Sequence, residues 1–463
     1  MLVRYRAPEP WRERGVHLLR LLPGAEIRAD ADACALDVTV EERGGELHVS
    51  VAGRGRAERA VVAADKKEYL RCLFQMLSSI QGEPLSPWGV LTGVRPGKVA
   101  AMLIAARGRR EAEARLCREW LLSPEKARLL VAAVANGYPL LRTGGVSVYV
   151  SVPFCPSRCH YCSFASLPLE RWRSNLPAYI RQAAWELQEL LAACSRHGIA
   201  VNSIYVGGGT PTALPPDLLA QLLAPAARPG CEFTVEAGRP DTLTPEHLEV
   251  LERLGVTRIS VNAQYPRDET LQAIGRQHSA GEFWAALALA QRSHINIINS
   301  DLIIGLPGQQ PQEFAGVIAD LAQRGVANIT LHALALKRGA ATRRQYMAAE
   351  AVQAIARAAY ARLEELGYVP YYLYRQKNIA SNLENVGFSR PGAFCYYNIA
   401  SIAETEPVLG AGAGAISKLV RAGTIATLNN PRDPNQYMER SAALVRRKLE
   451  WLRDAVDKPG RAW

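Results

Sequence analysis

Six short apolar runs, each followed by a stretch of helical periodicity, constrain the fold of this chain more than any other feature. The helical stretches are about ten to fifteen residues long, a spacing typical of repeated strand–helix units that build a parallel sheet. The runs are VSVYVSVPF, SIYVGGGT, EFTVEAG, RISVNAQ, IINSDLIIGLP and NITLHALAL. Six such units suit an open, partial barrel of the TIM type. We therefore predict an α/β fold with a partial (β/α)6 barrel at residues 144–340.

The segments on either side have different patterns. In residues 1–143, CALDVTVEERGGELHVSVAG predicts two strands joined as a hairpin, and helical periodicity follows from about Lys66 to Leu141. That periodicity is interrupted by GEPLSPWGVLTGVRPGK, which we expect to form an ordered loop. We predict an N-terminal α+β domain whose role the sequence does not indicate.

The segment 341–463 begins with an Ala-rich helix that we expect to end near Leu366. A stretch rich in Tyr, Asn and Arg follows, and the helix NQYMERSAALVRRKLEWL comes last. We predict a mostly helical C-terminal domain that completes the substrate cleft. Arg375 and Lys377 in this segment either meet acidic groups of a substrate or belong to a solvated face.

Composition narrows the class of protein. Hydrophobic residues make up 48% and charged residues 21% of the 463, an ordinary globular balance. No apolar run approaches the roughly 18 residues of a membrane span, and the start, MLVRYRAPEPWRERG, lacks the features of a signal peptide. The net charge of +11 comes from scattered arginines without a Lys/Arg run, which argues against nucleic-acid binding. We expect a cytoplasmic protein.

Unusual residues stand where the predicted strands end. Cys155 follows the first strand, Gly207 to Thr210 follow the second, and Glu236 lies on the third. Gln264 ends the fourth strand and Asp301 lies on the fifth. Because the chemistry of such barrels takes place at the C-terminal ends of the strands, these residues predict a site at that rim.

Cys155, Cys159 and Cys162 form a C-x3-C-x2-C pattern within PFCPSRCHYCSF. In a reducing compartment such a group indicates metal or redox chemistry rather than disulfides. Three thiolates can hold three irons of a four-iron cubane and leave the fourth iron open, which is the mark of a reactive centre. Zinc bound with His160 as a fourth ligand is an alternative, although four ligands so close in sequence would strain a tetrahedron. Three ordinary buried cysteines are a third, for which a loop position is unsuited.

The motifs together resemble a known family. The cysteine loop after a first strand, followed by a Gly-rich loop, resembles the radical S-adenosylmethionine (SAM) superfamily. YVSVPFCPSRCHYCSF, YVGGGTPT and NSDLIIGLPGQ resemble its oxygen-independent coproporphyrinogen III dehydrogenase group, which includes related haem chaperones. PWGVLTGVRPGK and YYLYRQKNIASNLENVGF resemble the dehydrogenase-like branch with an extra N-terminal domain.

This resemblance implies a [4Fe–4S] cluster and SAM as cofactors, with Cys155, Cys159 and Cys162 as the cluster ligands. In that family the open iron binds SAM, and one electron cleaves it to a 5′-deoxyadenosyl radical. The resemblance implies further SAM contacts, which in this sequence are Tyr149, Gly208, Gly209, Thr210, Glu236, Gln264, Arg276 and Asp301. No catalytic residue beyond these is assigned.

Each of these residues also has an ordinary structural interpretation. Without the resemblance, the glycines would form an ordinary strand–helix turn, and Glu236 would belong to a structural ion pair. Arg276 would be a surface arginine, Asp301 a turn residue and Tyr149 a core side chain. His332 is either a core histidine or a contact to haem or substrate. The GAGAGA run from Gly410 is a tight connection rather than a dinucleotide loop, because it lacks the required glycine spacing.

The pattern departs from the dehydrogenases at one position. Those enzymes carry a fourth cysteine two residues after the third, where this chain has Phe164, and the chaperone relatives lack it too. The first hypothesis is a dehydrogenase that converts two propionates of coproporphyrinogen III to vinyl groups with the help of a reducing donor such as flavodoxin or ferredoxin. The alternatives are a haem-binding chaperone and a radical SAM enzyme acting on another tetrapyrrole.

Overall fold

The computed structural model describes residues 1–22, 24–30, 34–162, 164, 166–227, 230–335, 347–376, 379–421 and 424–457. The chain forms two compact units. The first comprises Met1–Ala135 with Leu373–Lys377, and the second comprises Asn136–Tyr372 with Asn378–Trp463. The three-domain division at 143 and 340 stays a prediction.

The first unit is built on a five-stranded sheet in the order β2-β1-β3-β4-β5. Its strands and the helices packed on them are β1 (Leu2–Arg6), α1 (Trp11–Leu19), β2 (Glu26–Arg28), β3 (Leu36–Arg43), β4 (Glu46–Gly53), β5 (Arg56–Ala63) and α2 (Lys66–Gln81). The predicted hairpin is confirmed, since β3 and β4 pair antiparallel. Gly44 and Gly45 turn the chain with φ of 58° and 83°, which glycine adopts without steric cost.

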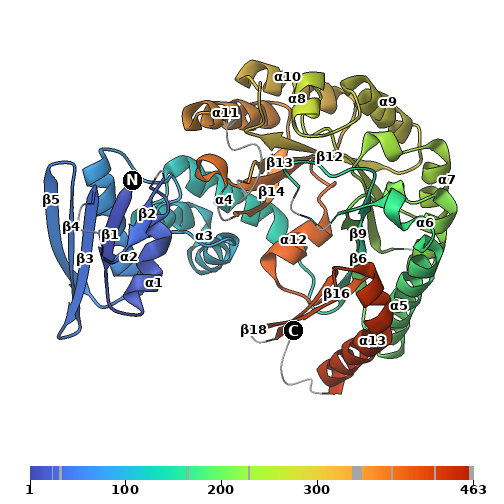
Figure 1. The fold of residues 1–463 in the computed structure, drawn as a ribbon, viewed down its shortest axis with the longest axis horizontal. Helices are drawn as coiled ribbons and strands as arrows, with labels where there is room; N and C mark the ends of the chain where they lie inside the picture. The colour runs from blue at the N-terminus through green and yellow to red at the C-terminus, as the bar shows by residue number, and fades with distance from the viewer. Residues whose placement is uncertain are drawn as a thin grey trace. The chain divides into compact units, whose positions relative to one another are not determined.

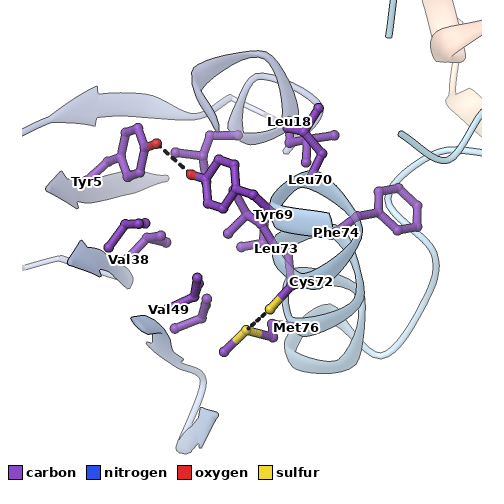
Figure 2. Packing of buried hydrophobic residues seen from close by; sticks show 14 of the residues in the cluster. Tyr5, Leu18, Val38, Val49, Tyr69, Leu70, Cys72, Leu73, Phe74 and Met76 are labelled. Atoms are coloured by element: carbon purple, nitrogen blue, oxygen red, sulfur yellow. Dashed lines mark hydrogen bonds between the residues drawn. The ribbon is translucent and has the colours of Figure 1, made fainter. Parts of the chain in front are cut away.

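Helix α2 has capping residues at both ends and an apolar face that covers the sheet. The Asp65 side chain caps it by accepting from the amides of Lys67 and Glu68, and Gly82 ends it with φ of 85°. Its buried face packs on alternate strand residues such as Val38 and Val49. Figure 2 shows the phenols of Tyr5 and Tyr69 pointing toward one another in this core, where their oxygens lie 2.8 Å apart.

Two further helices, α3 (Gly97–Trp120) and α4 (Pro124–Gly137), follow the predicted loop. Trp88 in that loop is completely buried. Arg375, whose guanidinium lies 5.1 Å from the Trp88 ring, donates to the carbonyl of Leu91 at 2.9 Å. Arg375 is therefore a buried part of the first unit and not a solvated residue. Lys377 lies outside the described residues.

The second unit contains the predicted parallel strands, in sequence order along an eleven-stranded sheet. They are β6 (Val146–Val152), β9 (Val201–Gly208), β10 (Glu232–Ala237), β11 (Arg258–Val261), β12 (Ile297–Ile304) and β13 (Asn328–Ala333). The short strands β7 (Phe154–Cys155) and β8 (Leu167–Pro168) pair separately after β6.

Side chains alternate along these strands, which gives the sheet two unlike faces. The outer face is apolar and buried, with residues such as Val148, Val150 and Ile204 at 0% exposure. The other face carries polar side chains in register, because Tyr149 aligns with Tyr205 and Glu236 aligns with Ser260. A sheet with a polar inner face and an apolar outer face is suited to surround a polar ligand.

Helices follow the parallel strands and lie in an arc along the outer face, as Figure 1 shows for α5 to α10. Their bounds are α5 (Leu176–Arg196), α6 (Pro216–Leu223), α7 (Pro245–Arg253), α8 (Asp268–Ala273), α9 (Ala280–Gln291) and α10 (Pro311–Gln323). This repeated strand–helix order brings the C-terminal ends of all six strands to one edge.

The C-terminal segment contains three helices and also extends both ends of the sheet. Its elements are α11 (Ala349–Glu365), β14 (Val369–Tyr374), β15 (Asn385–Ser389), α12 (Tyr396–Ala403), β16 (Val408–Ala411), β17 (Ile416–Arg421), β18 (Thr424–Asn429) and α13 (Pro434–Asp457). Residues 341–346 of the predicted Ala-rich helix lie outside the described residues. Strand β16 is parallel to β6, so the GAGAGA run is partly strand and only then a turn.

Candidate functional site

The cysteine loop begins at the edge where the parallel strands end. Cys155 closes β7, and the amide of Cys162 donates to the carbonyl of Cys159 at 3.2 Å. All nine cysteines are free thiols. Burial raises the pKa of Cys155 to about 11, while a hydrogen bond from Thr210 Oγ1 to its sulfur, at 3.4 Å, acts in the opposite direction. A thiol in such a place ionises when it binds a metal, because the metal's charge replaces the proton.

His160 lies beside the cysteines in sequence, but its ring contacts another element. Its Nδ1 lies 3.3 Å from the carbonyl oxygen of Ala273, and a Cβ on Gly275 would come within 2.8 Å of Nε2. Among the described residues, no three His, Cys, Asp or Glu side chains converge where they would hold one metal ion.

The glycine loop after β9 is attached to the strand that leads into the cysteine loop. The amide of Gly209 donates to the carbonyl of Val152, and that of Thr210 donates to the carbonyl of Phe154, both at 2.7 Å. A Cβ on Gly209 would lie 2.4 Å from the Phe154 carbonyl oxygen, so only glycine allows this approach. Gly208 has φ of 105°, which also favours glycine. The predicted residues Gly208, Gly209 and Thr210 are therefore next to Cys155.

Glu236 lies on the inner face, beside the glycine loop. Its Oε1 accepts a hydrogen bond from the Tyr205 hydroxyl at 2.5 Å. Burial raises the pKa of Glu236 to about 7, although the hydrogen bond from Tyr205 lowers it, and the nearby Asp301 charge raises it further. Such a carboxyl becomes ionised when a cation binds next to it.

Three tyrosines stack below Glu236. The ring centroid of Tyr149 lies 6.2 Å from that of Tyr205 and 6.1 Å from that of Tyr397, and the Tyr205 and Tyr397 centroids are 4.5 Å apart. Tyr149 thus stacks on Tyr205, the tyrosine that is hydrogen-bonded to Glu236. Its side chain is partly exposed on the inner face. It is not a fully buried core side chain.

Gln264 and Asp301 are adjacent at the ends of the next two strands. The Gln264 amide donates to the Asp301 carbonyl at 2.9 Å, and Gln264 has φ of 59°, an uncommon conformation for a residue other than glycine. The Asp301 carboxylate accepts from Asn299 Nδ2 at 2.9 Å, and its Oδ2 lies 3.7 Å from His332 Nε2.

Asp301 and His332 modify each other's protonation. Burial acts to raise the pKa of Asp301, but the His332 contact outweighs it and leaves the pKa below its ordinary value. Burial acts to lower the pKa of His332, but the contact with Asp301 outweighs it and leaves the pKa above its ordinary value. Both side chains keep some exposed surface, 22% and 29%, so neither is a sealed core residue.

Arg276 links three parts of the site. Its Nη1 donates to the Asn262 carbonyl at 2.9 Å, and its Nη2 donates to the Tyr161 hydroxyl at 3.1 Å and to the Gly238 carbonyl at 3.3 Å. The arginine is buried, with 6% exposure, so the surface interpretation is wrong. Its Nε has no partner among the described residues, and a contact of this group with SAM stays a prediction.

Sequence reasoning missed Arg239 and Tyr397. Arg239 donates to the side chain of Ser157, between the first two cysteines, at 3.0 Å. The signal for Arg239 was its position three residues after Glu236, at the end of a parallel strand. Tyr397 lies in helix α12, far from the barrel strands in sequence, and no local pattern indicates its partners.

The radical SAM superfamily matches residues 149–321 of this chain. The "Oxygen-independent coproporphyrinogen-III oxidase-like protein HemZ" of Bacillus subtilis (strain 168) is 38% identical over 392 residues, which cover 80% of this chain and 78% of that protein. This chain belongs to that family of radical SAM proteins. The "Heme chaperone HemW" of Mycobacterium tuberculosis (strain CDC 1551 / Oshkosh) is 30% identical over 312 residues, 63% of this chain and 73% of the chaperone.

A solved structure agrees in fold. Coproporphyrinogen III oxidase (HemN) from Escherichia coli, described as a radical SAM enzyme, superposes with a TM-score of 0.52 over 65% of this chain and 70% of its own, at 22% identity. The prediction of a radical SAM α/β fold is confirmed, and so are a [4Fe–4S] cluster and SAM as the cofactors. The three free thiols of the cysteine loop suit a [4Fe–4S] cluster. Zinc is not the metal of the radical SAM family. No helix in the described part of the chain is long and apolar enough to span a bilayer.

Proposed function

We propose that this protein is an oxygen-independent coproporphyrinogen III dehydrogenase. The observation that carries the proposal is the 38% identity to an oxygen-independent coproporphyrinogen-III oxidase-like protein across 80% of the chain, well beyond the barrel alone. The reaction converts two propionate side chains of the substrate to vinyl groups and yields protoporphyrinogen IX.

The cofactors are held at the rim of the parallel strands. Cys155, Cys159 and Cys162 would hold the [4Fe–4S] cluster, next to the residues that would bind SAM. The partly exposed backbone of Gly208 and Gly209 contacts the methionyl part of SAM. When bound and reduced, these cofactors supply a carbon radical able to abstract hydrogen from an unactivated carbon.

The remaining side chains recognise parts of SAM by their chemistry. Glu236 is the carboxylate that meets the ammonium group, and Thr210 lies at the end of the glycine loop, beside Cys155. Asp301 accepts hydrogen bonds from the ribose hydroxyls, because its carboxylate is already ionised and oriented by Asn299 and His332. Gln264, Arg276 and Tyr149 complete the contacts.

For each of the two propionates, SAM held by these residues would supply, with one electron from a reducing donor such as flavodoxin or ferredoxin, the radical that removes a hydrogen atom from the β-carbon. Loss of CO2 and of one electron to an acceptor leaves the vinyl group. We place the reaction in the cytoplasm, where the donors are found.

A haem chaperone is the second candidate. It is supported by the 30% identity to a haem chaperone over 63% of this chain and by Phe164, which occupies the position of the fourth cysteine and is 61% exposed. In that case the same fold would carry haem and pass it to another protein.

One experiment separates the two. Purified full-length protein is reconstituted with iron and sulfide under anaerobic conditions, reduced, and incubated with SAM and coproporphyrinogen III. Chromatography of the oxidised products is expected to show protoporphyrin at the expense of coproporphyrin. Unchanged coproporphyrin, together with stoichiometric haem binding by the same preparation, would overturn the dehydrogenase and support the chaperone.

A further inference from the structure

A buried arginine that is not among the predicted cluster ligands or SAM contacts touches the cysteine loop. Arg239 follows β10, and its side chain is 3% exposed. Its Nη1 donates to Ser157 Oγ at 3.0 Å. Ser157 lies between Cys155 and Cys159, so this hydrogen bond ties a cation directly to the loop.

Arg239 is held rigidly by a second contact on its other edge. Its Nε donates to Asp241 Oδ1 at 2.9 Å and its Nη2 to Asp241 Oδ2 at 2.8 Å, a bidentate pair. The Oδ1 atom also lies 3.5 Å from Nδ1 of the buried His278. Because two parallel hydrogen bonds fix the plane of the guanidinium, the direction of the third donor toward Ser157 is fixed as well.

The positive charge of Arg239 lies against the loop that bears the three cluster ligands. Its guanidinium is buried and reaches Ser157, which lies between the first two of these ligands. Three thiolates give a four-iron cluster a net negative charge, and reduction adds one more negative charge. A fixed cation in a buried environment therefore favours the reduced cluster.

We propose that Arg239 is a positioning residue for the cluster, which orders the cysteine loop through Ser157 and makes the cluster easier to reduce through its fixed charge. The inference rests on the cysteine ligands of the proposed function but not on the identity of the tetrapyrrole. Asp241 has the opposite electrostatic effect, because its negative charge partly offsets that of Arg239. Arg239 and Asp241 together therefore set the reduction potential of the cluster.

The test is a redox titration of the full-length, reconstituted protein without substrate, followed by electron paramagnetic resonance of the reduced cluster. Arg239→Gln is expected to shift the midpoint to a more negative potential. We expect the ratio of reduced to oxidised cluster at fixed potential to fall about tenfold, which is about 59 mV for one electron. Asp241→Asn is expected to shift the midpoint in the positive direction, and Arg239→Lys to restore most of the wild-type value.

Opposite shifts are the decisive result, since a role in folding alone would not give the two variants shifts of opposite sign. Arg267→Gln, which removes an exposed arginine paired with Glu269 and Glu313, serves as the matched control and is expected to leave the midpoint unchanged. An unchanged midpoint in Arg239→Gln and Asp241→Asn at full iron content would overturn the inference. If Arg239→Gln does not retain iron, Asp241→Asn still decides, because it leaves the arginine in place. Loss of the cluster in Cys159→Ala tests the ligands separately.

Discussion

The hydroxyl of Tyr205 donates to Oε1 of Glu236 across 2.5 Å, so that a tyrosine on β9 controls the charge of a carboxyl group on β10. Burial raises the pKa of Glu236 to about 7, and the Tyr205 hydrogen bond opposes that rise. Near neutral pH the carboxyl is therefore close to half ionised before any ligand binds. If Glu236 meets the ammonium group of SAM, the affinity for SAM depends on this equilibrium.

Tyr205→Phe is expected to weaken SAM binding several-fold near neutral pH. Without the hydroxyl, the pKa of Glu236 rises above about 7, and a larger share of the carboxyl is protonated when SAM arrives. Affinity is expected to recover as the pH is raised by one to two units. Isothermal titration of reconstituted protein across the neutral range measures this. Identical pH profiles for the wild type and Tyr205→Phe would contradict the role of the hydrogen bond.

Glu236 also makes the stability of the apoprotein depend on pH. Its pKa in the folded state, about 7, lies above the ordinary value of 4.5, so the folded state binds the proton more tightly than the unfolded state does. Glu236 therefore stabilises the fold least above pH 7, and its contribution is lost as the pH rises from about 4.5 to about 7. Denaturant unfolding at pH values near both ends of this range measures the free energy of unfolding. This free energy is expected to fall less with rising pH in Glu236→Gln than in the wild type. Equal losses in both proteins would show that Glu236 titrates normally.

Gly209→Ala is expected to abolish SAM binding and to lower the iron content. The added Cβ would lie 2.4 Å from the Phe154 carbonyl oxygen, so the backbone leading into the cysteine loop must move. Gly316→Ala is the control, because a Cβ there meets nothing within 4 Å and alanine favours the helix by about 1 kcal/mol. Iron analysis and SAM titration are the measurements. Normal binding by Gly209→Ala would show that the two loops are not coupled.

Lys448→Met is expected to destabilise the second unit by about 3–5 kcal/mol, because it leaves the buried Glu186 carboxylate without its cation. The Lys448 ammonium lies 2.5 Å from Glu186 Oε1 and both side chains are completely buried. Arg362→Ala breaks a solvent-exposed pair with Glu365 and is expected to cost less than about 1 kcal/mol. Denaturant unfolding followed by fluorescence compares the two. Similar costs would show that the buried pair contributes no more than an exposed one.

The sequence predicted the strands of the barrel well because each is a compact apolar run bounded by turns. It also placed Cys155, Glu236 and Asp301 at one edge, since parallel strands bring their C-terminal ends together. Strand β16 was missed because VLGAGAG has too few large side chains to show a strand pattern. Its pairing with β6 depends on contacts that lie far away in sequence.

Side-chain partners were less predictable than strands. Tyr397 stacks on Tyr205 across 192 positions, the difference between their residue numbers, and nothing local to either residue indicates the other. Arg276 is a predicted SAM contact, but both of its terminal nitrogens already donate hydrogen bonds, to Asn262, Tyr161 and Gly238. Such contacts depend on the three-dimensional packing of neighbouring strand ends.

The most direct test of the central claim is the ratio of 5′-deoxyadenosine to CO2 formed from coproporphyrinogen III under anaerobic conditions. A dehydrogenase that uses one SAM for each propionate is expected to give equal amounts of the two, and Cys159→Ala is expected to give neither. Cys117→Ser, a thiol in the first unit, is expected to behave as the wild type. 5′-Deoxyadenosine without CO2 would contradict the assignment, because SAM would then be cleaved without decarboxylation of the substrate.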